Sequence, residues 1–291
     1  MNTNEQRGSH SNAPKRKRNP AKRKQSRLIL SLSLVAILLT VLVGFMLLYA
    51  FPANDFKDLS EQVHAAAQTT STKPEALDPA APAQALDGTP AAETEPVEKN
   101  MLPHYAELYA KNPDLFGWVR IDDTAIDYPV MRSVDNPEKY LHANFDAAYS
   151  YPGTPFAEAQ CSNDSDNILI YAHNMLDGSM FRSLLKYENK NYWEAHPIIM
   201  YSDLYGEYEC EVVAAFYDRV YKKTENVFKF YQFIDAEDAG HYNNAIDNFK
   251  AKSLYETGVN ATYGDQLITL VTCAYHTDNG RFVVVARKNA E

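Results

Sequence analysis

The sequence predicts one mainly β domain, a barrel or a sandwich with peripheral helices, that is held to a membrane by an N-terminal helix. Three observations lead to this expectation. About eight short segments in the C-terminal two thirds are apolar or alternate in polarity, and turn residues separate them. A stretch of 24 residues near the N-terminus carries no charge. Between the two lies a segment rich in Ala, Pro, Thr and Glu that has no aromatic residue and cannot build a core.

The charge-free stretch, Leu28–Phe51, is long enough to span a hydrocarbon core of ~30 Å at ~1.5 Å per residue. The first 51 residues hold nine Lys and Arg against one acidic residue. Because basic flanks stay inside, residues 1–27 are predicted to form a cytoplasmic tail, with the rest of the chain outside the plasma membrane. A cleaved signal peptide is the alternative. The apolar run is longer than a usual signal core and no small-x-small site precedes Pro52, so residues 28–51 are predicted to remain as a signal anchor.

Residues 52–100 are predicted to be an extracellular spacer. Within them Asn54–Gln68 shows a weak amphipathic pattern, and Thr69–Lys99 has the composition of a disordered chain with a reach of roughly 30 Å. After residue 51 the chain carries 19 of the 28 basic and 37 of the 38 acidic residues, a net charge of −18. An acidic exported domain lacks the positive charge that phosphates require, so no nucleic-acid partner is expected.

Residues 101–291 form the predicted domain. Its helices are predicted from spacing and flanking turn residues, and its strands from β-rich runs. The helical segments are Pro103–Lys111, Ser179–Glu188, Asn191–Ala195 and Ala236–Lys252, while Asn136–Asn144 is either a turn or a single helical turn. The clearest strands are Phe116–Ile121, Ile126–Met131, Asn167–His173, Ile198–Tyr201, Tyr208–Tyr221, Leu267–Thr272 and Arg281–Lys288. Such a domain buries enough core to need no disulfide or metal.

The last two strands suggest chemistry. Cys273 ends one of them, Arg281 begins the next, and the polar turn His276–Gly280 joins them as a hairpin. A thiol and a guanidinium at these positions face one cleft, where the charge favours the thiolate and stabilises an oxyanion. The hairpin alone is equally consistent with a buried core Cys beside a surface Arg. Of the other thiols, Cys210 is expected to pack in an alternating strand and Cys161 to lie in a polar loop.

His173 stands out among the eight histidines because it closes an apolar strand, NILIYAH, where side chains meet loops and clefts. A histidine titrates in the physiological range and suits proton transfer. A metal site would need clustered ligands, and the one close Cys/His pair, Cys273 and His276, has no partners. No metal or other cofactor is therefore expected.

The motifs YAHN (Tyr171–Asn174), TLVTC (Thr269–Cys273) and RFVVVARK (Arg281–Lys288), in this order, closely resemble those of the sortases, Gram-positive surface transpeptidases with a TLxTC motif, an upstream His and a downstream Arg. Further segments resemble class B in particular, and the resemblance covers Pro103–Arg287. These segments are NPDLFGWVRID (Asn112–Asp122), YPVM (Tyr128–Met131), NPEKYL (Asn136–Leu141), MF (Met180–Phe181) and the helical insertion before the last hairpin.

The resemblance implies an eight-stranded sortase-type barrel with Cys273 as nucleophile, His173 as general acid/base and Arg281 as the oxyanion-stabilising residue. It also implies substrate contacts by Thr272, Val271 and Asn174. Chemistry supports this division of roles, because a guanidinium cannot give up its proton and fits only charge stabilisation. Val271 and Ala274 depart from the staphylococcal-type pattern TLSTCE, where Ser and Glu stand, and these neighbours shape the substrate groove.

In function, the resemblance implies cleavage of a C-terminal sorting signal, NPxTN-like in class B, on surface proteins. The acyl group would then pass to an amine of a peptidoglycan precursor resembling lipid II. One alternative is a pilin-polymerising sortase that uses a Lys of the next subunit as the amine. Another is a tethered binding module without catalysis, which an unreactive Cys273 would indicate. A papain-like hydrolase is disfavoured because no third residue is evident to orient the His.

Overall fold

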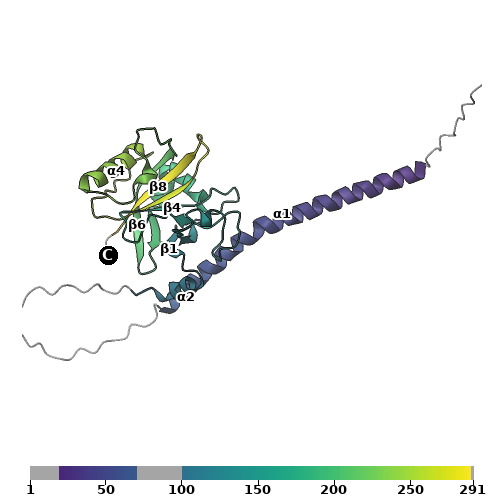
Figure 1. Ribbon diagram of the computed structural model, residues 1–291, viewed down its shortest axis with the longest axis horizontal. Coiled ribbons are helices and arrows are strands. Elements are labelled where there is room, and N and C mark those ends of the chain that lie inside the picture. The colour runs from purple at the N-terminus through teal and green to yellow at the C-terminus, as the bar shows by residue number, and fades with distance from the viewer. Residues whose placement is uncertain (1–19, 71–99, 290–291) are drawn as a thin grey trace, which may run out of the picture. The chain divides into compact units, whose positions relative to one another are not determined.

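The computed structural model describes residues 20–70 and 100–289 (Figure 1). Its helices are α1 (Pro20–Thr70), α2 (Pro103–Lys111), α3 (Lys190–Ala195) and α4 (Ala239–Lys252), with 3-10 segments η1 (Lys139–Leu141), η2 (Phe181–Glu188) and η3 (Phe230–Gln232). Its strands are β1 (Leu115–Arg120), β2 (Asp127–Met131), β3 (Phe156–Ala157), β4 (Asn167–Tyr171), β5 (Ile198–Ser202), β6 (Glu207–Arg219), β7 (Leu267–Cys273) and β8 (Gly280–Lys288).

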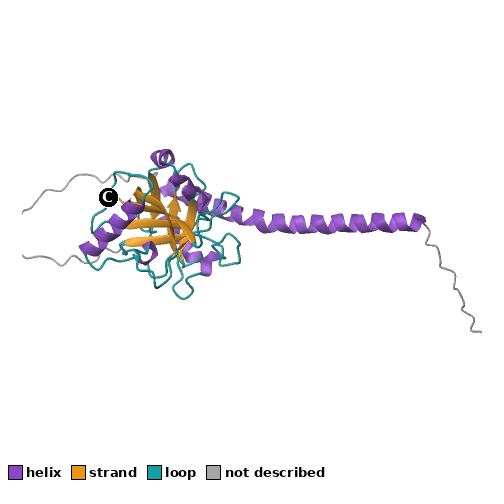
Figure 2. Ribbon diagram, turned by 90° about the horizontal axis from the view of Figure 1, so that it is seen from above, coloured by secondary structure: helices purple, strands orange, loops and turns teal. Residues whose placement is uncertain are grey.

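The eight strands close into a barrel in the order β1-β2-β3-β4-β7-β8-β6-β5. Figure 2 shows them gathered in the middle of the unit, with helices and loops around them. Six of the pairings are antiparallel, while β2–β3 and β4–β7 are parallel. Of the two architectures predicted from the strand pattern, the barrel is therefore confirmed and the sandwich is wrong.

Two apolar layers lie on the two faces of the barrel wall. Along β7, Ile268 and Leu270 belong to the interior core, whereas Leu267 and Val271 pack in a second cluster outside the wall. This alternation follows from the period of two in a strand. Because both faces are covered, β4, β7 and β8 are almost continuously apolar, and the sequence shows runs such as ITLV and FVVVA.

Helix α4 covers the outer layer with its buried face, which includes Tyr242, Ile246 and Phe249. At the C-terminal end of α4, the Lys252 ammonium lies 2.6 Å from the carboxylate of Asp218 on β6. Asp218 is only 5% exposed. This ion pair ties the helix to the barrel wall.

The two thiols outside the last hairpin are fully buried. Cys210 packs in β6 as predicted, and burial raises the pKa of its thiol to about 12. Cys161 lies between β3 and β4, in a loop as predicted, yet it is buried in the outer layer. Burial raises the pKa of the Cys161 thiol to about 11. Neither thiol is reactive in this setting, because a nucleophile must be ionised and accessible.

The weak amphipathic segment Asn54–Gln68 is not a separate helix but the last part of α1. Phe56 and Val63, both 3% exposed, pack on the barrel, and the Phe56 ring meets Tyr128 edge-on at 5.5 Å. His64 Nε2 lies 2.9 Å from a carboxylate oxygen of Asp127. The compact unit that contains the barrel accordingly begins at Ala50, earlier than the start near residue 101 that composition suggested.

The chain before residue 50 forms a second unit, Met1–Tyr49, which contains the first part of α1. Leu28–Phe51, the predicted anchor, lies within α1. Among the described residues, no helix combines the length and the hydropathy that a membrane span requires. Most of the predicted basic tail and the predicted disordered spacer, residues 1–19 and 71–99, lie outside the described residues.

Candidate active site

Strand β7 brings the predicted site residues together, because it lies between β4 and β8 in the barrel. Cys273 is paired directly with Arg281 across the antiparallel β7–β8 ladder. On the other side, the parallel β4–β7 ladder pairs Tyr171 with Val271. His173 follows two residues after Tyr171, beyond the last paired position, and the amide of the next residue, Asn174, donates to the Cys273 carbonyl at 2.8 Å. This hydrogen bond holds the segment after β4 against the end of β7, and His173, Cys273 and Arg281 line one cavity.

All three side chains project from the outer face of the barrel wall. Side chains two residues apart in a strand point to the same face. Cys273 therefore points to the same face of β7 as Val271, and Arg281 to the same face of β8 as Val283. Both valines lie in the outer layer. Tyr171 packs against that layer as well, two residues before His173. The site is therefore built on the outer surface of strands whose inner surface is core.

The predicted hairpin is confirmed, and Gly280 explains its tightness. The Ala274 N–H donates to the Gly280 carbonyl at 3.0 Å, which closes the ladder immediately after Cys273. A Cβ on Gly280 would lie 2.2 Å from the Ala274 carbonyl oxygen, so only glycine fits here. Asn279, just before it, adopts a left-handed φ of 56°, which Asn tolerates.

His173 is held by a backbone carbonyl. Its Nε2 lies 3.0 Å from the Leu141 carbonyl oxygen, which can only accept a hydrogen bond, so Nε2 carries a proton and Nδ1 is left for proton exchange. The ring stacks on that of His142 at 5.2 Å and 27°. Burial lowers the pKa of His173 below its usual 6.5, and the charge of His142 lowers it further. The hydrogen bond to Leu141 raises the pKa but does not cancel these effects. The His173 imidazole is therefore neutral at pH 7.

The Arg281 guanidinium is oriented by its own turn. Its Nη1 donates to the carbonyls of Gly280 at 2.9 Å and Asn279 at 3.3 Å. Among the described residues no carboxylate forms an ion pair with it. The Nε and Nη2 hydrogens are thus left for a ligand, in the fixed planar fork that suits an oxyanion or a peptide carbonyl.

The three predicted substrate-binding residues have different surroundings. Val271 and Thr272, both 1% exposed, line the same cavity as Cys273, and the Thr272 hydroxyl donates to the Ala172 carbonyl at 2.9 Å. Asn174 does not line that cavity; its amide donates to the Cys273 carbonyl at 2.8 Å and accepts from Arg182 at 2.9 Å. These contacts fasten the end of β7 to the loop after His173.

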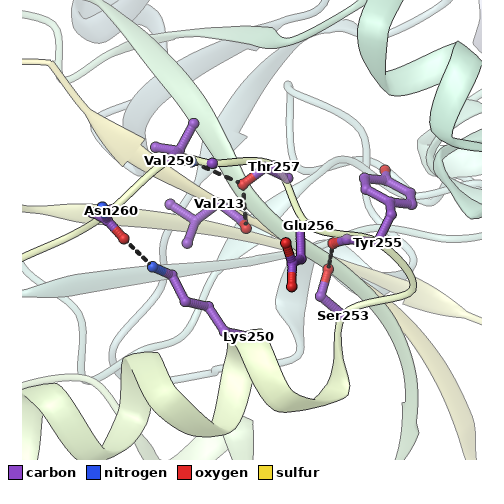
Figure 3. A pocket seen from close by; sticks show the side chains of 9 residues that line it. Val213, Lys250, Ser253, Tyr255, Glu256, Thr257, Val259 and Asn260 are labelled. Atoms are coloured by element: carbon purple, nitrogen blue, oxygen red, sulfur yellow. Dashed lines mark hydrogen bonds between the residues drawn. The ribbon is translucent and has the colours of Figure 1, made fainter.

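A cavity of about 420 Å³ contains His173, Cys273 and Arg281 in its lining. A second cavity, about 520 Å³, lies between the end of α4 and β6 and has none of them (Figure 3). Its polar groups bind each other: Lys250 donates to the Asn260 side chain, and Thr257 donates to the Val213 carbonyl at 2.9 Å. The first cavity holds the reactive groups and is the candidate active site.

Sequence reasoning missed the groups that orient His173. The Leu141 carbonyl and the His142 ring come from a segment some 30 residues earlier, and a backbone acceptor leaves no sequence signal. Arg182, which holds Asn174, was also missed. His142 follows η1, 31 residues before His173, and only the fold brings the two rings together.

A model of the Sortase domain matches residues 119–289 of this chain. Two curated relatives are a Sortase B of Listeria monocytogenes, 35% identical over 61% of this chain and 71% of the relative, and a Sortase B of Staphylococcus aureus, 31% identical over 65% and 76%. The fold is similar to that of a solved complex of Staphylococcus aureus sortase B with a substrate, with a TM-score of 0.64 and 24% identity over 81% of this chain and 95% of that one. It is also similar to a solved sortase B from Bacillus anthracis, with a TM-score of 0.58 and 28% identity, over 66% of this chain and 86% of that chain.

Proposed function

Since the chain belongs to the sortase family and is a class B cysteine transpeptidase, we propose that it joins surface proteins to the cell wall through a thioester on Cys273. One observation carries this assignment of the nucleophile: Cys273 is paired with Arg281 across the β7–β8 ladder and lines one cavity with Arg281 and His173. The other two thiols are buried.

The first half of the reaction forms the acyl-enzyme. His173, neutral at pH 7, takes the thiol proton at Nδ1, and the sulfur attacks the carbonyl of the cleaved bond. The negative charge that develops on the carbonyl oxygen is stabilised by the free donors of Arg281. His173 then returns the proton to the leaving amine, and the N-terminal part of the substrate remains as a thioester on Cys273.

The second half runs in reverse with a different amine. The incoming amine attacks the thioester, His173 accepts its proton, and the thiolate leaves. Thr272 and Val271 line the cavity and are proposed to contact the substrate beside the attacked carbonyl. Asn174 is proposed to act by holding the Cys273 carbonyl and so the direction of the thiol.

The proposed substrate is an NPxTN-like sorting signal, and the proposed acceptor is the amine of a peptidoglycan precursor. The class B motifs of the sequence support the NPxTN-like signal, and one similar solved structure, of Staphylococcus aureus sortase B, is a complex with a substrate. We propose further that residues 28–51 anchor the chain in the plasma membrane, with residues 1–27 inside and the barrel outside. The charge-free run and the basic cluster before it support this topology.

The experiment uses the full-length chain in detergent micelles with NPxTN and LPxTG peptides and triglycine as the amine. Mass spectrometry is expected to detect a peptide–triglycine product that is absent for Cys273→Ala. If the wild-type chain leaves every peptide intact, or if Cys273→Ala forms the product equally well, the proposed function is wrong.

A further inference from the structure

The last part of helix α1 is fastened to the start of strand β2. The Phe56 ring, which is 3% exposed, meets the Tyr128 ring edge-on at 5.5 Å. One and two turns further along the helix, the Ser60 hydroxyl and the His64 Nε2 atom contact the carboxylate of Asp127. Residues spaced by four lie on one face of a helix, so a single face of α1 makes all three contacts.

Tyr128 extends this contact to the backbone of Met180. Its hydroxyl accepts a hydrogen bond from the Met180 N–H at 3.1 Å. Met180 is 2% exposed and has a φ of 53° and a ψ of −136°, a backbone conformation that residues with a side chain rarely adopt. Such a conformation persists only where the surrounding structure holds it. The Tyr128 hydroxyl is one of the groups that hold it, and the Phe56 ring fixes the Tyr128 ring in turn.

Met180 closes the loop that follows β4, and this loop leads to the reactive residues. Met180 pairs with Asn174 in an isolated antiparallel bridge. The next residue, Phe181, donates its N–H to the His173 carbonyl at 3.0 Å. Asn174 in turn donates its side-chain amide to the Cys273 carbonyl at 2.8 Å. The backbone at Met180 therefore holds both the backbone of His173 and the end of β7.

Another apolar side chain of α1 packs in a different place. Val63 is 3% exposed, as Phe56 is, but it belongs to a separate cluster that contains Trp118. Phe56, Tyr128 and Met180 all belong to the interior core of the barrel. The same helix thus has one buried contact that leads to the reactive residues and an equally buried one in another cluster, so an effect on catalysis can be separated from an effect on stability.

We propose that Phe56 and Tyr128 are positioning residues, through which helix α1 holds the loop after β4 in the geometry in which His173 and Cys273 react. The proposal rests on the proposed function and makes the helix that follows the predicted anchor a part of the catalytic scaffold. Neither residue is among the described residues that line the active-site cavity, so both act on kcat and leave KM nearly unchanged. A displacement of about 1 Å at a reacting group costs up to about 10²-fold in rate, and we expect about tenfold here.

The experiment measures kcat and KM of the full-length chain in detergent micelles for ligation of an NPxTN peptide to triglycine, with the unfolding temperature of each variant. Tyr128→Phe removes the acceptor of the Met180 N–H and keeps the ring. Phe56→Ala removes the ring contact, and Phe56→Leu restores most of the apolar volume. Val63→Ala is the matched control, because Val63 lies on the same helix and is equally buried.

We expect kcat to fall about tenfold in Tyr128→Phe and in Phe56→Ala with KM within twofold of wild type, and to recover to within threefold in Phe56→Leu. The double variant should lose no more than either single variant, because both changes interrupt the same series of contacts. Val63→Ala should unfold at a lower temperature and keep kcat within twofold.

A kcat within twofold of wild type in Tyr128→Phe, or in folded Phe56→Ala, would overturn this inference and leave the proposed function standing. An equal loss of kcat in Val63→Ala would also overturn it, because helix packing alone would then explain the effect. If the wild-type chain ligates no peptide, the proposed function is refuted, and the inference with it.

Discussion

Replacing Arg281 by Lys tests the oxyanion role most sharply, because the substitution keeps the charge and removes the fork. In the native site, Nη1 uses both hydrogens on the carbonyls of Gly280 and Asn279, and three N–H groups are left for the substrate. An ammonium on a flexible stem cannot keep those two anchors and also present donors in one plane. Loss of one such oxyanion donor costs about 2.7–4 kcal/mol in the transition state, which is about 10²–10³ in rate.

We therefore expect kcat/KM of Arg281→Lys to fall by about two orders of magnitude, measured by chromatography of the peptide–triglycine product. Arg287→Lys is the control on the same strand, since Arg287 pairs with Glu211 at 2.5 Å and is far from the thiol. Its activity should stay within twofold of wild type, and both variants should unfold at nearly the wild-type temperature. Turnover of Arg281→Lys within threefold of wild type would show that the guanidinium fork does not stabilise the oxyanion.

Three further predictions concern the surroundings of the site. In His142→Phe the ring stack stays and the charge is lost, so the pKa of His173 should rise toward 6.5 in an NMR titration; an unchanged pKa would contradict the electrostatic coupling. Asn174→Ala removes hydrogen bonds of 2.8 and 2.9 Å and should lower the free energy of unfolding by about 2 kcal/mol along with the acylation rate. A denaturation curve that coincides with that of wild type would argue against this role. Lys252→Met leaves the Asp218 carboxylate buried without its cation and should cost about 3 kcal/mol of stability, by urea unfolding, with activity retained in folded protein. Undiminished stability would mean that the pair is not needed to hold α4.

The pH dependence of the reaction follows from the lowered pKa of His173. Because the pKa lies below 6.5, the base form predominates at neutral pH, and protonation stops proton transfer only as the pH falls below that value. The same burial makes the folded state less stable in acid, since His173 binds a proton more readily when the chain is unfolded.

The hairpin of Cys273 and Arg281 could be predicted from the sequence because every signal is local: two β-rich runs, a polar turn and a glycine. The order of strands could not, because the β4–β7 pairing joins residues about 100 positions apart. The orientation of His173 depends on a backbone carbonyl at Leu141, which any residue type would supply. The segment around Phe56 and Val63 gives only a weak signal in the sequence, since Phe56 is buried by packing on Tyr128 of the barrel.

Cys273 is proposed to be the sole nucleophile and to carry the acyl group to an amine. The direct measurement is intact-protein mass spectrometry of the full-length chain mixed with an NPxTN peptide, first without and then with triglycine. We expect a mass increase equal to the N-terminal part of the peptide, located on Cys273 by proteolytic mapping and lost when triglycine is added. An adduct on Cys161 or Cys210, or product formation by Cys273→Ala, would contradict it.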